Sequence, residues 1–239
     1  MDLETIATMG DFDFTFLYDS FDRSRFLKGI YYTVLISVSC IAISVSLGMA
    51  GAIRLAYGTR IERWLIGGFV SLFRNTPPLI QIYLFFFGFG AIVSNATDNS
   101  IVIPAVAWAV IAVSIYITAF NIEAFRAAIE GIPKELMEGA ASLSLPRTAV
   151  LWKIVVPLGV RGALPSVGNN LVELVKSTSY AYAIAVPELL YASSQIWADS
   201  LNVVEMMFAM LAVYMVLIGA VVLCTQTLER RLALPGYGG

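Results

Sequence analysis

Charged side chains interrupt two long apolar stretches of this sequence, and their types are suited to recognising a polar solute. Residues 64–97 hold one charged residue, Arg74. In residues 162–198 the charged residues are Glu173, Lys176 and Glu188. A charge near the centre of a bilayer costs on the order of 2.5–3.5 kcal/mol. If these stretches cross a membrane, Arg74 and Lys176 are expected to face a bundle interior, a partner subunit or a water-filled path.

The residue types needed for catalysis or metal binding are scarce. The sequence has no histidine, which removes the usual general base and the commonest transition-metal ligand. No pair of carboxylates suited to acid–base catalysis is evident, and no nucleophile lies beside a base. The phosphate-binding pattern G-x-x-x-x-G-K followed by Ser or Thr is absent. We therefore expect no catalytic residue, no metal site and no ATP bound by this chain.

The composition indicates a membrane protein. Charged residues make up 13% of the sequence and hydrophobic residues 59%, whereas soluble domains carry roughly 25% charged residues. Three charge-free runs exceed the roughly 20 residues that a helix needs to cross the hydrocarbon core, namely residues 29–53, 99–122 and 206–228. With the two interrupted stretches, they predict an all-α protein with five transmembrane helices, at about 29–53, 65–91, 101–122, 163–190 and 205–228.

The distribution of lysine and arginine predicts how these helices are oriented. The basic residues after the first, third and fifth spans are Arg54, Arg60, Arg63, Arg126, Lys134, Arg147, Lys153, Arg161, Arg230 and Arg231. Residues 91–103 and 191–204, which follow the other two spans, contain none. Because basic loops stay in the cytoplasm, the N-terminus is expected outside and the C-terminus in the cytoplasm. Arg23, Arg25 and Lys28 are exceptions on the outer side.

One transmembrane domain accounts for most of the chain. We expect residues 1–28 to form a periplasmic or interfacial segment, and residues 29–232 to form the transmembrane domain. Its loop at about 126–162 is expected in the cytoplasm. Residues 233–239 are rich in glycine and are expected to form a C-terminal tail.

The expected cytoplasmic loop is long for a membrane protein and carries its own helix signals. Pro133 and Pro146 restrict the backbone before them and delimit a short helix over 134–143. Gly139, Ala140 and Ala141 in this helix have little side-chain bulk, so another surface can approach closely. A second helical piece is expected to stop at Pro157. A short, small-sided helix between two breaks favours a rigid docking surface.

At these residues the chain resembles the inner-membrane permease subunits of ATP-binding-cassette importers. The family motif is Glu-Ala-Ala, then a Gly, then an apolar residue and a Pro. Its counterparts here are Glu138-Gly139-Ala140, Ser144, Ile154 and Pro157. Gly139 and Ser144 depart from the motif but are small, and Ser144 leaves open whether the backbone angle that glycine favours is kept. The resemblance implies coupling to an ATPase subunit through Glu138, Gly139, Ala140, Ala141, Ser144, Leu145, Ile154 and Pro157.

Three further segments resemble the polar amino acid uptake branch of that family. Residues 73–81 read FRNTPPLIQ, similar to its F-R-x-T-P-L-L-x-Q signature. Glu123 and Arg126 match its E-x-x-R pattern, and we expect them to form a structural pair at a helix end. Residues 161–179 follow its R-x-x-L-P, N and K-D-T-S series, with Ser177 in place of Asp. The similarity extends over about residues 26–229, and the ordered set is more specific than any single motif.

This resemblance implies a fold, a task and a set of partners. The implied fold is that of a type I importer permease in the bacterial inner (cytoplasmic) membrane, and the implied function is ATP-driven amino acid import. ATP and magnesium would be bound by the partner ATPase. The implied partners are two ATP-binding subunits, an identical or paralogous second permease, an extracytoplasmic solute-binding protein, the amino acid and membrane lipid, with no nucleic acid. Which amino acid is transported stays open.

Residues in and beside the interrupted spans are candidates for lining the translocation path. They are Thr76, Pro77, Gln81, Lys176, Thr178 and Ser179. Thr76-Pro77-Pro78 frees backbone carbonyls within a span, and irregular backbone at that depth is tolerated where it lines a cavity. Lys176 either contacts the solute or a gate, or forms a structural pair with Glu173 one turn away. Thr178 and Ser179 either offer hydroxyls to the solute or bond back to their own helix.

Two other classes of membrane protein are alternatives. An ATP-independent secondary transporter or channel subunit commonly shows inverted repeats and ionisable relays at the midplane, and neither is clear in this sequence. A non-transporting anchor or receptor subunit fits poorly with the proline-broken second span and with Lys176. Dependence of uptake on an added ATPase subunit separates the first alternative from the importer.

Overall fold

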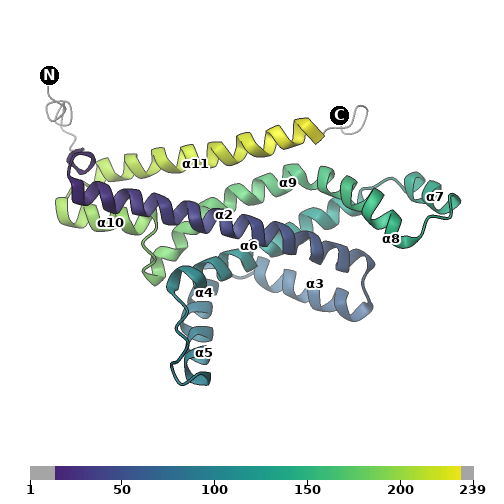
Figure 1. Ribbon diagram of the computed structural model, residues 1–239, viewed down its shortest axis with the longest axis horizontal. Coiled ribbons are helices and arrows are strands. Elements are labelled where there is room, and N and C mark those ends of the chain that lie inside the picture. Colours follow the sequence, from purple (N-terminus) through teal and green to yellow (C-terminus); the bar gives the residue numbers. More distant parts are fainter. Residues whose placement is uncertain (1–13, 233–239) are drawn as a thin grey trace. The chain divides into compact units, whose positions relative to one another are not determined.

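The structure, a computed structural model of the chain, describes residues 14–232, and within this range it contains helices and turns but no strand (Figure 1). The predicted tail, 233–239, and residues 1–13 of the predicted N-terminal segment lie outside the described residues. Five described segments are long and apolar enough to cross a membrane: Ser20–Tyr57, Pro78–Ala96, Ala105–Glu130, Arg147–Ile184 and Val203–Leu232. The expectation of an all-α protein with five transmembrane helices is confirmed.

Several of these segments are built from more than one helical element. In chain order the elements are the 3-10 helix η1 (Thr15–Leu17), α2 (Ser20–Tyr57), α3 (Arg60–Arg74), α4 (Pro78–Tyr83), the π-helical η2 (Leu84–Phe89), α5 (Gly90–Ala96), α6 (Ala105–Glu130), α7 (Lys134–Ser142), α8 (Arg147–Val150), the π-helical η3 (Leu151–Val155), α9 (Val156–Ser177), the 3-10 helix η4 (Thr178–Ile184), α10 (Leu189–Ser200) and α11 (Val203–Leu232).

The second span begins later than its hydropathy indicates. The sequence predicts one crossing at 65–91, but the helix breaks before Pro78. The side chains of Asn75 and Thr76 donate to the Ser71 and Leu72 carbonyls, at 2.7 and 2.9 Å, and complete the end of α3. Proline lacks an amide and is tolerated in the first helical turn, so α4 can start at Pro78. Arg74 therefore lies on α3, outside the membrane-spanning candidates, and not within a span as predicted.

Pro157 does not stop a helix, contrary to expectation. The helical run continues from α8 through η3 into α9, and Pro157 lies in the first turn of α9. A proline at this position has no amide to donate to the Lys153 carbonyl, and the wider π-helical turn of η3 directly before it accommodates the loss. Pro165 also lies inside α9. The fourth membrane-spanning candidate is therefore Arg147–Ile184, where the sequence indicated 163–190.

The described residues divide into two compact units, and the first comprises residues 14–40, 77–113 and 173–219. Its core contains Phe16, Phe26, Leu189, Ile196 and Met206, all buried. Helices α2 and α10 touch closely in this unit. A Cβ added at Gly29 would lie 2.7 Å from the Ala192 Cβ and 3.1 Å from the Leu189 Cα. No side chain fits there, so glycine sets the separation of these two helices.

Contacts in the same unit account for Arg25, one of the basic residues on the expected outer side that depart from the positive-inside pattern. The Arg25 guanidinium lies 2.7 Å from an Asp199 carboxylate oxygen and 3.2 Å from one of Asp22. It also stacks over the Phe21 ring, 5.1 Å from the ring centroid. These contacts tie the start of α2 to the end of α10.

The second unit comprises residues 41–76, 114–172 and 220–232 of the described chain. Its helices meet through small residues. Gly159 and Gly162 of α9 lie against Ile129 and Ala128 of α6, with added Cβ atoms at 3.0 and 3.3 Å. Gly168 lies against Thr225 of α11 at 3.3 Å. Small residues let helix backbones approach closely. The resulting van der Waals packing stabilises the contact in lipid, where no hydrophobic driving force acts between helices.

Candidate functional site

The predicted docking helix is present as α7 and belongs to the second unit. Turns containing Pro133 and Pro146 separate it from α6 and α8 (Figure 1). Ala140 is 4% exposed and anchors the helix, whereas Glu138, Gly139 and Ala141 are exposed. A Cβ added at Gly139 would meet no atom within 4 Å. The small-residue face of α7 is therefore open to another surface.

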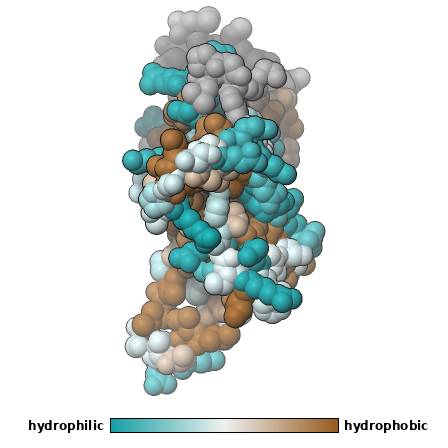
Figure 2. Space-filling view, turned by 90° about the vertical axis from the view of Figure 1, so that its right-hand side faces the viewer, coloured by the Kyte–Doolittle hydropathy of each residue, from teal (hydrophilic) through white to brown (hydrophobic). Residues whose placement is uncertain are grey.

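Apolar side chains are exposed beside this small-residue face. Leu136 is 40% exposed, Leu143 74% and Leu145 38%. Figure 2, which views the structure from the side of α7 and α8, shows hydrophilic and hydrophobic side chains exposed next to one another. Exposed leucines rimmed by polar groups are typical of a surface that binds a protein.

Ser144 adopts the backbone conformation that glycine favours. Its φ angle is 54°. The Leu145 amide donates to the Ala140 carbonyl at 3.2 Å, and the Ser144 amide donates to the Ala141 carbonyl at 2.9 Å. This pair of bonds is the Schellman arrangement, whose left-handed position is usually glycine. The chain keeps the left-handed angle although it has serine there.

The remaining two residues of the coupling motif are less accessible. Ile154 on η3 and Pro157 on α9 are both half-buried, and Val155 between them is fully buried. They follow α7 along the chain as part of the continuous run from α8 into α9. The exposed members of the set are Glu138, Gly139, Ala141, Ser144 and Leu145.

Two motifs that are distant in the sequence meet in an ionic cluster of the second unit. Arg126 donates to Glu123 through Nε and Nη2 at 2.9 and 2.7 Å, and to Glu130 through Nη1 at 2.6 Å. The Arg74 guanidinium lies 3.9 Å from the other Glu123 oxygen and 5.3 Å from the centroid of the Phe120 ring. The cluster joins the end of α3 to α6. Sequence reasoning placed Glu123 beside Arg126 but missed the contact with Arg74.

A buried polar chain links three helices in the same unit. Asn121 of α6 is fully buried, donates from Nδ2 to the Ser44 Oγ of α2 at 3.3 Å, and accepts from Asn170 of α9 at 3.0 Å. Gly48 on α2 lies so close that an added Cβ would be 2.6 Å from the Asn121 Cβ. This link was not predicted. The only sequence signal for it was amide side chains inside apolar runs.

The candidate residues for the translocation path, apart from Thr76, lie in the first unit. Thr76 is the last residue of its segment in the second unit and closes α3. In the first unit α4, which carries Gln81, contacts η4, which begins with Thr178 and Ser179. The Thr178 hydroxyl donates to the Val175 carbonyl and that of Ser179 to the Lys176 carbonyl, both at 2.8 Å. Both hydroxyls thus bond back to their own helix, the second of the two alternatives.

Lys176 and Glu173 form a loose and accessible ion pair on α9. The Lys176 Nζ lies 3.5 Å from a Glu173 carboxylate oxygen. The lysine side chain is 55% exposed and the glutamate side chain 45%. Both residues lie inside the membrane-spanning candidate Arg147–Ile184.

Glu188 is a buried carboxylate that caps a helix outside the membrane-spanning candidates. It is fully buried and accepts from the amides of Leu190 and Tyr191 at the start of α10, at 2.9 and 2.8 Å. The Tyr214 hydroxyl lies 3.5 Å away. Burial raises the pKa of the Glu188 carboxyl from its ordinary 4.5 to about 7, although these hydrogen bonds oppose the rise. The sequence placed Glu188 near the outer end of a span but did not reveal the cap.

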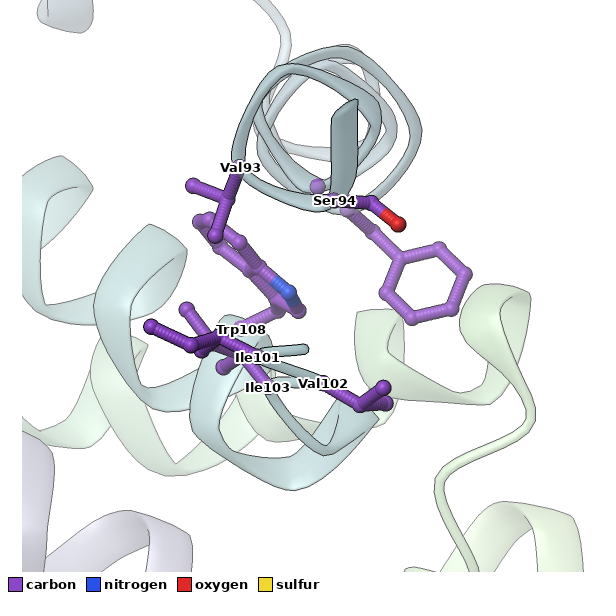
Figure 3. A pocket seen from close by; sticks show the side chains of 8 residues that line it. Val93, Ser94, Ile101, Val102, Ile103 and Trp108 are labelled. Atoms are coloured by element: carbon purple, nitrogen blue, oxygen red, sulfur yellow. The ribbon is translucent and has the colours of Figure 1, made fainter. Parts of the chain in front are cut away.

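An apolar pocket of about 170 Å³ lies elsewhere in the first unit. Val93 and Ser94 of α5 line one side, and Ile101, Val102, Ile103 and Trp108 line the other (Figure 3). The Ser94 hydroxyl donates to Asn99. No residue that lines the pocket is charged, so it offers no ionic partner to a charged solute.

Metal ligands do not gather in the part of the chain that the structure describes. No group of three or more Cys, Asp or Glu residues within 14–232 is placed to hold a metal ion. Cys40 is buried and Cys224 is exposed, and neither forms a disulfide.

Comparison with known proteins gives consistent matches along the chain. The family model for the binding-protein-dependent transport system inner membrane component matches residues 42–234. The probable glutamine ABC transporter permease protein GlnM of Bacillus subtilis is 30% identical, over 90% of this chain and 96% of its own. The L-cystine transport system permease protein TcyB of the same species is 29% identical, over 85% of each.

A solved structure has the same fold. The crystal structure of an amino acid ABC transporter with histidines contains a chain that superposes with a TM-score of 0.76. The match covers 90% of this chain and 98% of that one, at 21% identity. Because the family model matches most of the sequence, this chain belongs to the family of inner membrane components of binding-protein-dependent transport systems.

Proposed function

We propose that this chain is the permease subunit of an ATP-driven amino acid importer. The observation that carries the proposal is α7, a short helix with an open small-residue face between two proline-containing turns. The two Bacillus subtilis relatives bear names of glutamine and L-cystine transport, which supports an amino acid as the solute. An ATP-independent transporter or channel has no need for such a docking helix.

The proposed assembly follows from the family. Two ATPase subunits bind ATP and magnesium and carry out hydrolysis, and this chain is not itself catalytic. A second permease, identical or paralogous, and an extracytoplasmic solute-binding protein complete the complex in the bacterial inner membrane. In this arrangement residues 126–162 face the cytoplasm and residues 1–28 face outward.

The proposed coupling starts at the exposed residues of α7. Closure of the ATPase subunits on ATP would move the Glu138–Leu145 segment, which the buried Ala140 anchors to the unit. The run from α8 through η3 and α9 continues without a break to Ser177. Displacement at α7 therefore has a helical route along the chain to Lys176, Thr178 and Ser179, and the spans change from inward-open to outward-open.

A charge reversal on α7 tests this proposal. We expect Glu138→Arg to abolish ATP-dependent uptake in the reconstituted complex while ATP hydrolysis becomes independent of the solute-binding protein. The reason is that Glu138 is exposed in the motif that would contact the ATPase. Uptake of labelled amino acids into proteoliposomes and phosphate release measure the two effects.

The matched control is Glu135→Arg, which makes the same charge change on the same helix outside the motif. Glu135 is also exposed, and we expect this variant to retain uptake. Equal amounts of both variants in the membrane fraction establish insertion. Full transport by the Glu138→Arg complex, or uptake by the unmodified complex without ATP, would overturn the proposal.

A further inference from the structure

The Glu173–Lys176 pair is exposed although it lies within a membrane-spanning candidate. About half of each side chain is accessible in this structure. Ionised groups within a membrane almost always face a bundle interior or a water-filled cavity, because contact with lipid tails is unfavourable. The accessible side of the pair therefore faces either a partner subunit or a path that water or a polar solute can reach.

The geometry of the pair leaves both groups open to competition. Charge-assisted hydrogen bonds between an ammonium and a carboxylate are usually about 2.7–2.9 Å long. The Lys176–Glu173 distance of 3.5 Å is longer. A partly exposed pair of this kind contributes little to stability, so a solute that offers both charges can replace the contact at small cost.

The helical turn that follows the pair along the chain and the helix packed against that turn supply no third charge for a solute. Helix α4, which packs against η4, has the sequence PLIQIY, and η4 itself contains no acid or base other than tyrosine. Glu188, which caps α10, is buried and engaged with two amides. At the other end of α10, Asp199 is bound to Arg25. One negative and one positive group are thus accessible, one helical turn apart.

We propose that Glu173 and Lys176 together bind the main-chain charges of a zwitterionic amino acid. The Glu173 carboxylate accepts hydrogen bonds from the α-ammonium group, and the Lys176 ammonium donates to the α-carboxylate. The substrates are then amino acids with uncharged side chains, because α4 and η4 carry no further ionic partner. This inference rests on the proposed function and adds a recognition site to it.

Analogues that lack one main-chain charge test the assignment. The complex of permease and ATPase subunits, without the solute-binding protein, is titrated with the labelled amino acid that the unmodified importer transports. Its methyl ester, which lacks the carboxylate, and its 2-hydroxy acid, which lacks the ammonium, are used as competitors. We expect each analogue to bind the unmodified complex at least about tenfold more weakly than the amino acid.

Removing one protein charge should remove one of these preferences. In Glu173→Gln the affinity of the 2-hydroxy acid should lie within about threefold of that of the amino acid, while the ester still binds at least about tenfold more weakly. Lys176→Met should show the opposite pattern, and Lys176→Arg, which keeps the positive charge, should behave like the unmodified chain. Glu130→Gln, which alters an exposed ion pair in the second unit, is the control and should change neither preference.

Three results would overturn the inference. The first is the same pair of analogue preferences in all variants, and the second is no measurable binding of the amino acid to the complex. The third concerns assembly, measured by size-exclusion chromatography: the complex is lost in both charge-removing variants but recovered in the double variant Glu173→Lys with Lys176→Glu. That result would assign the pair to a subunit interface. ATP-driven uptake by the unmodified complex is measured separately, so a failed inference is distinguishable from a failed function.

Discussion

Ser144 shows how one residue can retain a backbone conformation that its side chain disfavours. The left-handed region costs a non-glycine residue about 1–2 kcal/mol. With φ at 54°, Ser144 bears this cost in order to close the end of α7. We therefore expect Ser144→Gly to raise the stability of the purified chain by about 1 kcal/mol, observed as a higher midpoint of thermal unfolding in detergent.

A second glycine substitution two residues earlier serves as the matched control. Ser142 is the last residue of α7, and its hydroxyl donates to the Glu138 carbonyl at 3.0 Å. Ser142→Gly removes this hydrogen bond and places the more flexible glycine at a helical position with an ordinary backbone angle, so it should lower the unfolding midpoint. If both variants shifted the midpoint in the same direction, the left-handed angle at Ser144 would not be the cause.

Glu188 makes the stability of the first unit depend on pH. Its carboxyl releases a proton at about pH 7 in the folded chain and at about its ordinary 4.5 in the unfolded chain. Between these values the folded state binds more protons, so the free energy of unfolding falls as pH rises through this window. The loss is on the order of 3 kcal/mol. The sequence contains no histidine that would obscure this titration.

The variant Glu188→Gln isolates this contribution. Glutamine keeps one of the two oxygens that cap α10 but does not titrate. The unfolding midpoint of this variant should therefore change less between pH 5 and pH 8 than that of the unmodified chain. Differential scanning fluorimetry of the detergent-solubilised chain measures both profiles. Parallel profiles for the two proteins would show that Glu188 does not titrate in this range.

At the scale of the element, a close contact between α2 and α6 in the second unit depends on Gly48. A Cβ there would lie 2.6 Å from the Asn121 Cβ, which is fixed to the α6 backbone and cannot move aside. We expect Gly48→Ala to cost about 1–3 kcal/mol, because α2 and α6 must separate and the bonds of Asn121 to Ser44 and Asn170 must lengthen. Thermal unfolding of the purified chain measures the loss.

Gly67 on α3 offers the comparison. An alanine Cβ at this position meets nothing within 4 Å. The substitution Gly67→Ala should therefore be neutral or stabilise the helix by about 0.5–1 kcal/mol. Destabilisation by Gly67→Ala as large as that by Gly48→Ala would mean that helix propensity, and not the contact with Asn121, accounts for the effect.

Helix ends were predictable where a local signal sets them. Pro133 and Pro146 bound α7 within one residue of the prediction, because a missing amide acts on its own turn. The same rule was wrong at Pro157, where the π-helical turn η3 accommodates the proline. Hydropathy also failed at the start of α4, since α3 carries apolar residues but is separate from the span.

The candidate site was predictable as residue types but not as contacts. The sequence alone shows that Lys176 is a charged residue within an apolar run and that α7 is rich in small residues. The contact of Arg74 with Glu123 and the Asn121 link join residues far apart in the chain, and only tertiary packing brings them together. The cap by Glu188 depends on how the turn before α10 folds, which a single glutamate among apolar residues does not reveal.

For the whole molecule, the orientation expected from the basic residues can be measured directly. In a background with Cys40 and Cys224 replaced by alanine, Ser100→Cys and Ser142→Cys each introduce one exposed thiol. We expect a membrane-impermeant maleimide to label position 100 in spheroplasts and position 142 only after the membrane is opened. The positive-inside rule predicts this result, because the loops rich in lysine and arginine lie on the same side of the membrane as residue 142 and are expected in the cytoplasm.

The reverse pattern of labelling would place the N-terminus in the cytoplasm. The proposed coupling would then fail as well, because α7 could not reach an ATPase. Full labelling of both positions in intact spheroplasts would indicate leaky membranes, and the cysteine-free background sets the level of unspecific label.

The exposed leucines beside the small-residue face of α7 have a consequence for the lifetime of the chain in the cell. A copy without its ATPase holds Leu136, Leu143 and Leu145 in contact with water. Such apolar surface is what quality-control proteases and chaperones engage. Surplus permease would then be removed faster than assembled permease, so the ATPase supply would set how much importer accumulates.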